Sequence, residues 1–351
     1  MSLLRLKLEY KKLLRRIVMY SLKIPRPGES PQEYFSNVPA VPYNSNERIL
    51  IYHTFKMGDL INFTNHLRVW RKHYPDIIID FLTYKNYAQI LETNKDIDNL
   101  LFIEDFPQLS LIKHVHKLDN QSVINAAPDI DQVMQRLFTD YFDYDKIINF
   151  WPIYYRNILF SLFSYERVAE NWIEMSLQVP KLFGFNFSMK IKDNMPLLYF
   201  SKQDIEIVKK VGKAYKDKKI VLFEHLSGSW PTRFTNLSDD IIWNLQDRRF
   251  LVAGNHAKCD INLQNLNLRQ IKLFFQKYCF MFIGCNSGVT SSVYSLPTNY
   301  KDKYMIIDAL CTNWNYYRYF KQKPKDYLFL VDQDEQYSLD QICDFCDKIE
   351  D

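Results

Sequence analysis

The stretch RILIYHTFKMGDLINFTNHLRVWRKHYPD, which runs from Arg48 to Asp76, decides how the rest of the chain is interpreted. It opens with a short apolar run and continues, after Gly58 and Asp59, with apolar residues at helical spacing. This pattern predicts a β-strand over residues 49–53 and a helix over residues 58–73. The turn between them pairs a glycine with a carboxylate, in a chain that has only eight glycines.

The same alternation of short apolar runs and helical spacing continues along the chain, and it predicts parallel sheets covered by helices on both faces. The expected strands are residues 49–53, 77–83, 99–103 and 146–150 in a first series and 219–223, 250–253, 280–283, 304–307 and 327–331 in a second. Further helices are expected at residues 130–141 and 202–216, and from about residues 238, 268, 288 and 338.

The length of 351 residues fits two domains of about 150 residues each. We expect an N-terminal basic helix with a Pro-rich linker over residues 1–47, a first Rossmann-like domain over 48–190 and a second Rossmann-like domain over 191–351. Two α/β halves of this kind make the cleft between them the natural place for a ligand.

The charge of the chain is concentrated at its start. Residues 1–24 hold seven of the 45 Lys and Arg but one of the 41 Asp and Glu, so the rest of the chain is close to neutral. A nucleic-acid partner is therefore not expected. The leader reads as a basic amphipathic helix, which either packs on the protein's own body or lies on an anionic inner-membrane surface. Both alternatives stay open.

The cysteines and the apolar runs indicate in which cellular compartment the protein is expected. All six cysteines lie from Cys259 onward, and the Cys343/Cys346 pair lacks the further ligands that a zinc site needs. A disulfide framework is typical of short secreted chains, so reduced thiols and a cytoplasmic location are expected. No apolar run reaches the roughly 18 residues of a membrane span.

Five of the eight glycines follow predicted strands, at the edge where open α/β sheets bind ligands. They are Gly58, Gly228, Gly254, Gly284 and Gly288. A dinucleotide-binding dehydrogenase would need Gly-x-Gly-x-x-Gly after its first strand. The first turn here, HTFKMGDLINF, has one glycine, so this alternative is excluded.

Four stretches carry a resemblance to a known family. They are the opening stretch from Arg48, IVLFEHLSGSWPTRFTNLSDDIIWNL from Ile220, FLVAGN from Phe250 and NLRQIKLFFQKYCFMFIGCNSGVTSSVYSLPT from Asn267. In this order and spacing, the chain resembles the bacterial lipopolysaccharide heptosyltransferases of glycosyltransferase family 9. The resemblance implies an α/β fold of the GT-B type, in which two Rossmann-like parallel-sheet domains face each other across a cleft. It also implies that residues 48–190 form the acceptor-side domain and residues 191–351 the nucleotide-sugar-binding domain.

The resemblance also implies a chemistry. It is inverting transfer of a sugar, without metal or cofactor, from a nucleotide sugar to a hydroxyl of a glycan or glycolipid such as lipopolysaccharide. Asp59 stands at the position of the family's proposed general base, which must reach the acceptor hydroxyl. The alternative for Asp59 is an acid that merely stabilises a helix N-terminus through the helix dipole.

Arg233 is expected to fork two phosphate oxygens of the leaving diphosphate, with an ordinary salt bridge as the alternative. Two positions depart from the family, which usually has Asp at Asn286 and His at Ser291, so the donor sugar is left open. The expected donor-binding residues are Gly58, Ser227, Gly228, Ser229, Arg233, Gly254, Asn286, Ser287, Gly288, Val289 and Ser291.

Two other functions remain as alternatives. A metal-dependent glycosyltransferase would use an Asp-x-Asp pair, and this spacing occurs at Asp96/Asp98, Asp129/Asp131 and Asp332/Asp334. A catalytically silent nucleotide- or glycan-binding protein on the same scaffold is favoured by the departures at Asn286 and Ser291 and disfavoured by Asp59.

Overall fold

The computed structural model describes residues 48–52, 57–106, 146–149, 195–227, 232–285, 287–297, 299–308, 323–330 and 335–350. The chain forms two compact units, the first comprising Met1–Thr54, His66–Ala88 and Asp96–Met189 and the second Phe55–Asn65, Gln89–Lys95 and Lys190–Asp351. The expected leader helix, the linker to residue 47 and the helix at 130–141 lie outside the described residues. The second unit takes in two short segments that come before residue 190, at 55–65 and 89–95.

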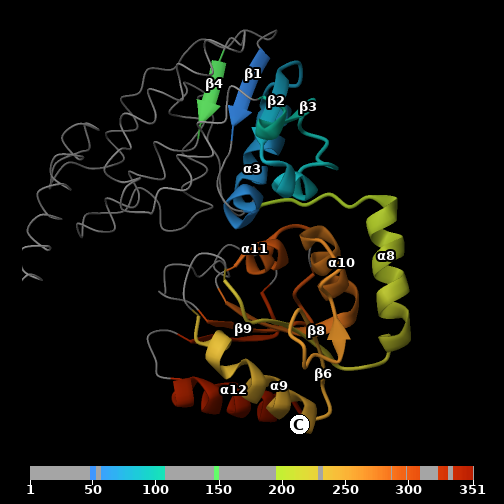
Figure 1. Ribbon diagram of the computed structural model, residues 1–351, viewed down its shortest axis with the longest axis vertical. Helices are drawn as coiled ribbons and strands as arrows, with labels where there is room; N and C mark the ends of the chain where they lie inside the picture. Colours follow the sequence, from blue (N-terminus) through green and yellow to red (C-terminus); the bar gives the residue numbers. More distant parts are fainter. Residues whose placement is uncertain are drawn as a thin grey trace, which may run out of the picture. The chain divides into compact units, whose positions relative to one another are not determined.

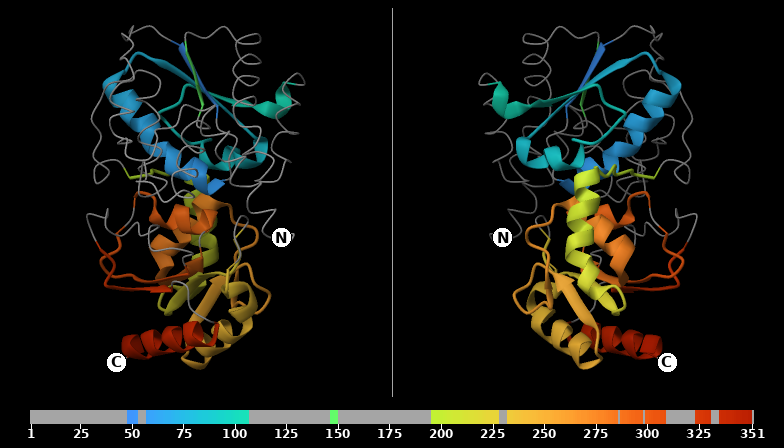
Figure 2. Two further views of the ribbon diagram at one scale, coloured as in Figure 1. Left: turned by 90° about the vertical axis from the view of Figure 1, so that its left-hand side faces the viewer. Right: turned by 90° about the vertical axis from the view of Figure 1, so that its right-hand side faces the viewer.

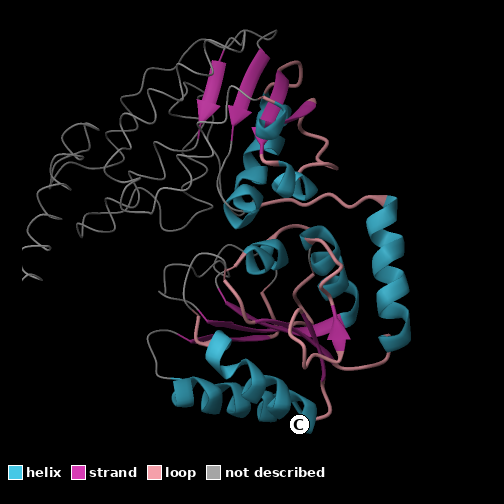
Figure 3. Cartoon of the chain, viewed as in Figure 1, coloured by secondary structure: helices cyan, strands magenta, loops and turns pink. Residues whose placement is uncertain are grey.

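The first unit holds a four-stranded parallel sheet (Figure 3). Its strands are β1 (Arg48–Tyr52), β2 (Ile78–Thr83), β3 (Asn99–Phe102) and β4 (Lys146–Asn149), in the order β3-β2-β1-β4. Ile49, Leu50 and Ile51 are all buried, as parallel strands covered on both faces require. The four strands predicted for this half are confirmed.

Helix α3 (Met57–His73) follows β1 and has Asp59 in its first turn and basic residues in its last. This distribution matches the helix dipole. Leu60, Leu67 and Trp70 are fully buried along it. Two short 3₁₀ helices, Lys85–Ile90 and Ile103–Asp105, were not predicted.

The second unit holds a six-stranded parallel sheet in the order β10-β9-β8-β5-β6-β7. Five of its strands confirm the prediction: β5 (Ile220–Glu224), β6 (Leu251–Gly254), β8 (Cys279–Cys285), β9 (Tyr304–Asp308) and β10 (Asp326–Leu330). The sixth, β7 (Ile261–Asn262), was missed because two residues are too few for a periodic signal.

Helices cover both faces of this second sheet (Figures 1 and 2). On one face lie α10 (Leu268–Tyr278) and α11 (Gly288–Tyr294), with α8 (Lys202–Gly212) packed on α10. On the other lie α9 (Phe234–Asp247) and α12 (Glu335–Glu350), packed on each other. Helix α9 begins four residues before the predicted start at Ser238 and α12 three residues before Ser338.

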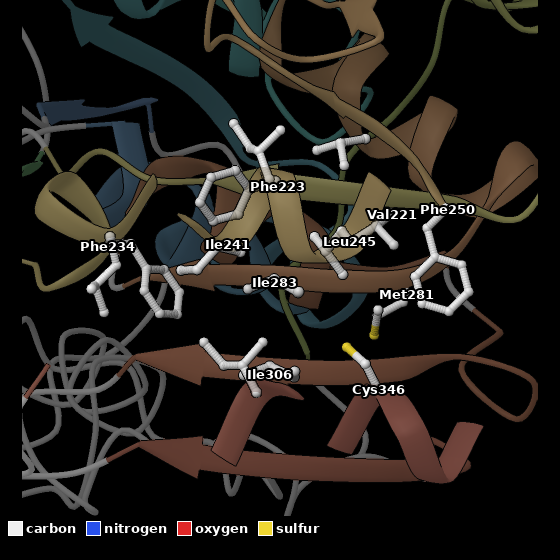
Figure 4. Packing of buried hydrophobic residues seen from close by; sticks show 14 of the residues in the cluster. Val221, Phe223, Phe234, Ile241, Leu245, Phe250, Met281, Ile283, Ile306 and Cys346 are labelled. Atoms are coloured by element: carbon white, nitrogen blue, oxygen red, sulfur yellow. The ribbon is translucent and has the colours of Figure 1, made fainter. Parts of the chain in front are cut away.

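The core of the second unit lies between its sheet and the α9/α12 layer (Figure 4). Val221 and Phe223 of β5 and Met281 and Ile283 of β8 point into it from the strands. Because strand side chains alternate between faces, Leu222 and Glu224 of β5 point to the opposite face, which α10 and α11 cover. The helix layers thus leave the carboxyl ends of β5 and β8 as the place to look for a site.

Candidate functional site

Both sheets have the same topological feature. In the first sheet, β2 and β3 are added on one side of β1, and β4 is then added on its other side. In the second sheet, β6 and β7 are added on one side of β5, and β8 is then added on its other side. The switch points therefore lie between β1 and β4 and between β5 and β8. In open α/β sheets, ligands bind outside the carboxyl ends of the strands at such points. Asp59 follows β1, and Ser287 follows β8.

The start of α3 lies against α11, and both belong to the second unit. A Cβ atom built on Gly58 would lie 3.1 Å from Ser291 Oγ and 3.5 Å from Gly288 Cα. Glycine at position 58 thus allows the backbone of α3 to approach α11 closely. The structure brings together Gly58, Gly288 and Ser291, and partly exposed Asp59 is the next residue of α3.

Gln89 fixes this arrangement from a third segment. Its side chain donates a hydrogen bond from Nε2 to Met57 Sδ at 3.3 Å and accepts one at Oε1 from Leu268 N at 3.0 Å. Gln89 thereby ties the first residue of α3 to the first residue of α10. The position of Asp59 is held by contacts within the second unit.

Three further predicted donor-binding residues have local structural roles. Ser287 caps α11 and accepts a hydrogen bond from Thr290 N at 3.2 Å. Val289 is buried in α11. A Cβ atom on Gly254 would lie 2.5 Å from Phe223 O, so close packing between β6 and β5 accounts for this glycine. Ser227 is half-buried after β5, while Gly228, Ser229 and Asn286 lie outside the described residues.

Arg233 is held by partners within the protein. Its guanidinium forms a salt bridge with Asp308 at the end of β9, with Nε donating to Oδ1 at 2.9 Å. Nη2 also donates to Leu330 O at 2.8 Å, and Nη1 donates to Ser338 Oγ at 3.3 Å. This geometry matches the salt-bridge alternative, and a phosphate would have to compete with a buried carboxylate. Its predicted phosphate contact stays a prediction.

The sequence reasoning overlooked Glu224, although it is the last residue of β5 at the switch point. Burial raises its pKa to about 7, and the hydrogen bond that its Oε1 accepts from Leu226 N at 3.0 Å opposes this rise only in part. Glu224 therefore exchanges its proton close to neutral pH. Its signal in the sequence was a carboxylate directly after the predicted strand at 219–223.

Two histidines follow neighbouring strands at the same edge. The rings of His225, after β5, and His256, after β6, lie 4.9 Å apart and nearly perpendicular. Burial, and then the nearby ring of His256, lowers the pKa of His225. His256 Nε2 also lies 3.5 Å from Asp239 Oδ1. The carboxyl edge of the second sheet thus gathers titratable side chains.

Of the Asp-x-Asp pairs that the metal-dependent alternative would use, the described residues include Asp96/Asp98. Asp98 Oδ2 accepts hydrogen bonds from Arg71 at 2.6 Å and from Ile79 N at 2.7 Å, which ties it to the start of β2. Asp129/Asp131 and Asp332/Asp334 lie outside the described residues. Among the side chains that are described, no three His, Cys, Asp or Glu gather as metal ligands would. The described helices likewise include none with the length and apolar character of a membrane span.

Two parallel sheets that each have a switch point are typical of doubly wound α/β proteins, in which ligands bind at such points. A family 9 glycosyl transferase from Veillonella parvula is similar with a TM-score of 0.54 and 14% identity, over 89% of this chain and 99% of that one. ADP-heptose lps heptosyltransferase II of E. coli matches with a TM-score of 0.46 and 11% identity, over 86% and 99%. E. coli heptosyltransferase WaaC, solved with ADP-2-deoxy-2-fluoro heptose, matches with a TM-score of 0.46 and 13% identity, over 86% and 99%.

No family model matches the sequence, and no curated protein matches it either. The likeness to the Veillonella protein shows that the chain has the fold of a family 9 glycosyl transferase. The GT-B type of α/β fold predicted from the sequence is thereby confirmed.

Proposed function

We propose that this chain is an inverting, metal-independent glycosyltransferase that moves a sugar from a nucleotide-sugar donor to a hydroxyl of a cell-surface glycan such as lipopolysaccharide. The observation that carries the proposal is the contact of Gly58 with Gly288 and Ser291. It sets the carboxylate-bearing turn of α3 beside the segment that follows β8. In an open α/β sheet, this is the end of the strands where a nucleotide would bind.

The roles divide between two segments. Asp59 acts as general base and takes the proton of the acceptor hydroxyl as the new glycosidic bond forms at the anomeric carbon. The bond to the diphosphate breaks on the opposite face, and the nucleoside diphosphate leaves with the electron pair. Ser287 and backbone groups after β8 hold the donor. We further propose a cytoplasmic location at the inner-membrane surface, reached through residues 1–24.

The alternative function, a binding protein without catalytic activity, was favoured by Ser291, because the family usually has His at this position. Ser291 is buried, and its Oγ lies close to the missing Cβ of Gly58. A larger side chain there would compete with the close approach of α3. The structure thus gives the small residue a packing role that is compatible with catalysis.

The proposal is tested by Asp59→Asn. A thermal-shift screen of ADP-, UDP- and GDP-sugars first identifies the donor, since a bound ligand raises the melting temperature. The variant is expected to bind that donor as the wild type does and to lose transfer by about two to four orders of magnitude, the usual contribution of a general base. The rate of sugar transfer is measured as product formation by mass spectrometry.

Asp76→Asn is the matched control, because Asp76 is an exposed carboxylate just beyond the other end of α3. It should leave transfer unchanged. EDTA is also expected to leave wild-type transfer unchanged. Normal transfer by the Asp59→Asn variant would contradict the assignment of Asp59 as general base. If EDTA abolishes wild-type transfer and Mn²⁺ restores it, the metal-dependent glycosyltransferase is the better hypothesis.

A further inference from the structure

We propose that Glu224 is a specificity-determining residue that binds the diphosphate of the donor as a neutral carboxylic acid. The inference rests on the proposed function and adds to it a second carboxyl group with a task different from that of Asp59. Asp59 must be ionised to accept a proton, whereas Glu224 must be protonated to donate a hydrogen bond to a phosphate oxygen.

The first step of the argument is position. Glu224 pairs in register with Gly284 of β8, so it lies at the switch point where the fold predicts a ligand. Alternation along β5 places its side chain on the face opposite to Phe223, the face that carries α11. The residues after β8 that approach Gly58 start from this same edge.

The second step is the environment of the carboxyl group. The ring of Phe282 lies across Gly284, because a Cβ atom built on that glycine would be 2.2 Å from Phe282 Cζ. Because Gly284 pairs with Glu224, this ring covers the neighbouring strand next to Glu224, where it displaces water without supplying a charge. Among the described residues, the one hydrogen bond to the carboxyl group comes from Leu226 N. Burial with so little compensation favours the neutral acid.

The third step concerns the charged and titratable groups around this edge. The Cys285 thiol of β8 lies near Glu224 but on the α9/α12 side of the sheet, and it stays neutral, since burial raises its pKa to about 12. Of the cations, Arg233 is paired with Asp308 and buried Lys272 of α10 donates to Val293 O at 2.6 Å. Other titratable groups that the described residues bring to this region are Asp59, His225, His256 and, beside His256, Asp239.

These facts give the neutral acid a physical advantage. An ionised Glu224 would repel a diphosphate, whereas the protonated group offers it a hydrogen bond. A bound diphosphate therefore raises the pKa of Glu224 further, and binding above neutral pH takes up a proton from solution. By this linkage, donor affinity falls as pH rises through the pKa of the free protein.

The test uses ADP, UDP and GDP as probes, with isothermal titration calorimetry between pH 6.5 and 8.5. The free nucleotide is already fully ionised at pH 8, since the last phosphate pKa is about 6. Wild-type dissociation constants are expected to rise about tenfold across this range, for a group with a pKa of about 7. At pH 8, titrations in two buffers of different ionisation enthalpy should report proton uptake.

Glu224→Gln keeps the shape and the hydrogen-bond donor but cannot ionise. It should bind as tightly as wild type at pH 6.5, lose the pH dependence and take up no proton. Glu206→Gln, at an exposed position of α8, is the matched control and should behave as wild type. His256→Asn tests the histidine pair and should keep the uptake. Circular dichroism confirms that each variant is folded.

The outcomes separate the two proposals. If no nucleoside diphosphate binds the wild type at any pH, the proposed function fails and the role of Glu224 fails with it. If one binds with a pH-independent affinity, or if Glu224→Gln keeps the proton uptake, the role of Glu224 is overturned while the proposed function stands.

Discussion

Two carboxyl groups of the second unit, buried Asp204 and half-buried Glu224, have pKa values shifted in opposite directions. Asp204 lies in the first turn of α8, where burial alone would raise its pKa. Hydrogen bonds from Ser201 and the guanidinium of Arg269 outweigh burial and hold the pKa below its ordinary value. Within the part of the chain that the structure describes, no cation pairs with Glu224, and burial raises its pKa to about 7. The difference teaches that a fully paired carboxylate holds helices together, whereas an incompletely paired one at a sheet edge has capacity left for a ligand.

The paired region is a network at the N-termini of α8 and α10. Arg269 Nε donates to Asp204 Oδ2 at 3.1 Å, and Nη1 donates to Gln89 O and, at 3.4 Å, to Glu92. Gln270 Nε2 donates to Asp204 Oδ1 at 3.0 Å. The network thereby joins residues 89–92 to both helices.

The largest effect is expected from Arg269→Leu. Removing the cation leaves Asp204 buried without a charged partner, which should lower the free energy of unfolding by about 3–5 kcal/mol at pH 7. Urea unfolding followed by circular dichroism measures the loss. Because Asp204 stabilises the fold only while ionised, the gap to wild type should narrow as pH falls below about 4.

The double variant Arg269→Leu/Asp204→Asn is the control for this network. Without an ionised Asp204, it should recover part of the lost stability, since no unpaired charge remains. An Arg269→Leu protein as stable as wild type would show that the network contributes nothing, and the comparison with Glu224 would break down.

The next largest effect is expected from Glu224→Gln, and its sign is opposite. The folded protein binds a proton at Glu224 that the unfolded chain releases near pH 4.3, so wild-type stability falls between that pH and about 7. The variant avoids this cost and should be more stable than wild type by about 3–4 kcal/mol at pH 8, with little difference at pH 4. Thermal unfolding at both pH values tests this. A constant difference across pH would contradict the assignment.

The smallest effect on stability is expected from Gly58→Ala, at the start of α3 where it approaches α11. The new Cβ atom would lie 3.1 Å from Ser291 Oγ, so one side chain must shift by a few tenths of an ångström. The gain of about 1 kcal/mol from replacing glycine in a helix offsets this cost. The unfolding free energy should therefore change by less than about 1 kcal/mol, while transfer falls several-fold because Asp59 moves.

Adding Ser291→Ala to Gly58→Ala removes the crowded oxygen and should restore transfer. Urea unfolding and initial transfer rates measure the two quantities separately. A stability loss as large as that of Arg269→Leu would mean that this edge is structural rather than functional.

Much of this fold could be predicted because parallel strands are buried on both faces and read as continuous apolar runs. The start of α9 was placed too late, since Phe234 enters the core from the helix's first turn and periodicity does not mark such a position. At the site, Gly58 and Gly288 could be predicted because glycine after a strand is a local signal. The Arg233–Asp308 salt bridge could not, because its partners are 75 positions apart.

Glu224 shows the same limit in another form. Its position at a strand end is visible in the sequence, but its pKa depends on burial and on the ring that crosses Gly284. A sequence gives the identity of a titratable group and leaves out its surroundings. Groups such as Glu224 are recognised only when the three-dimensional structure shows which residues surround them at the edge of the sheet.

Helix α3 is divided between the two units, and this division limits how domains can be exchanged between proteins of this fold. Residues 55–65 and 89–95 belong to the second unit, although they come long before residue 190. A chimera joined at residue 190 would replace most of the second unit and leave behind Gln89, the native partner of Leu268 and Arg269. Recombination that exchanges the second unit as a whole must therefore transfer three segments of the chain together, and the carboxylate of Asp59 would be transferred with them.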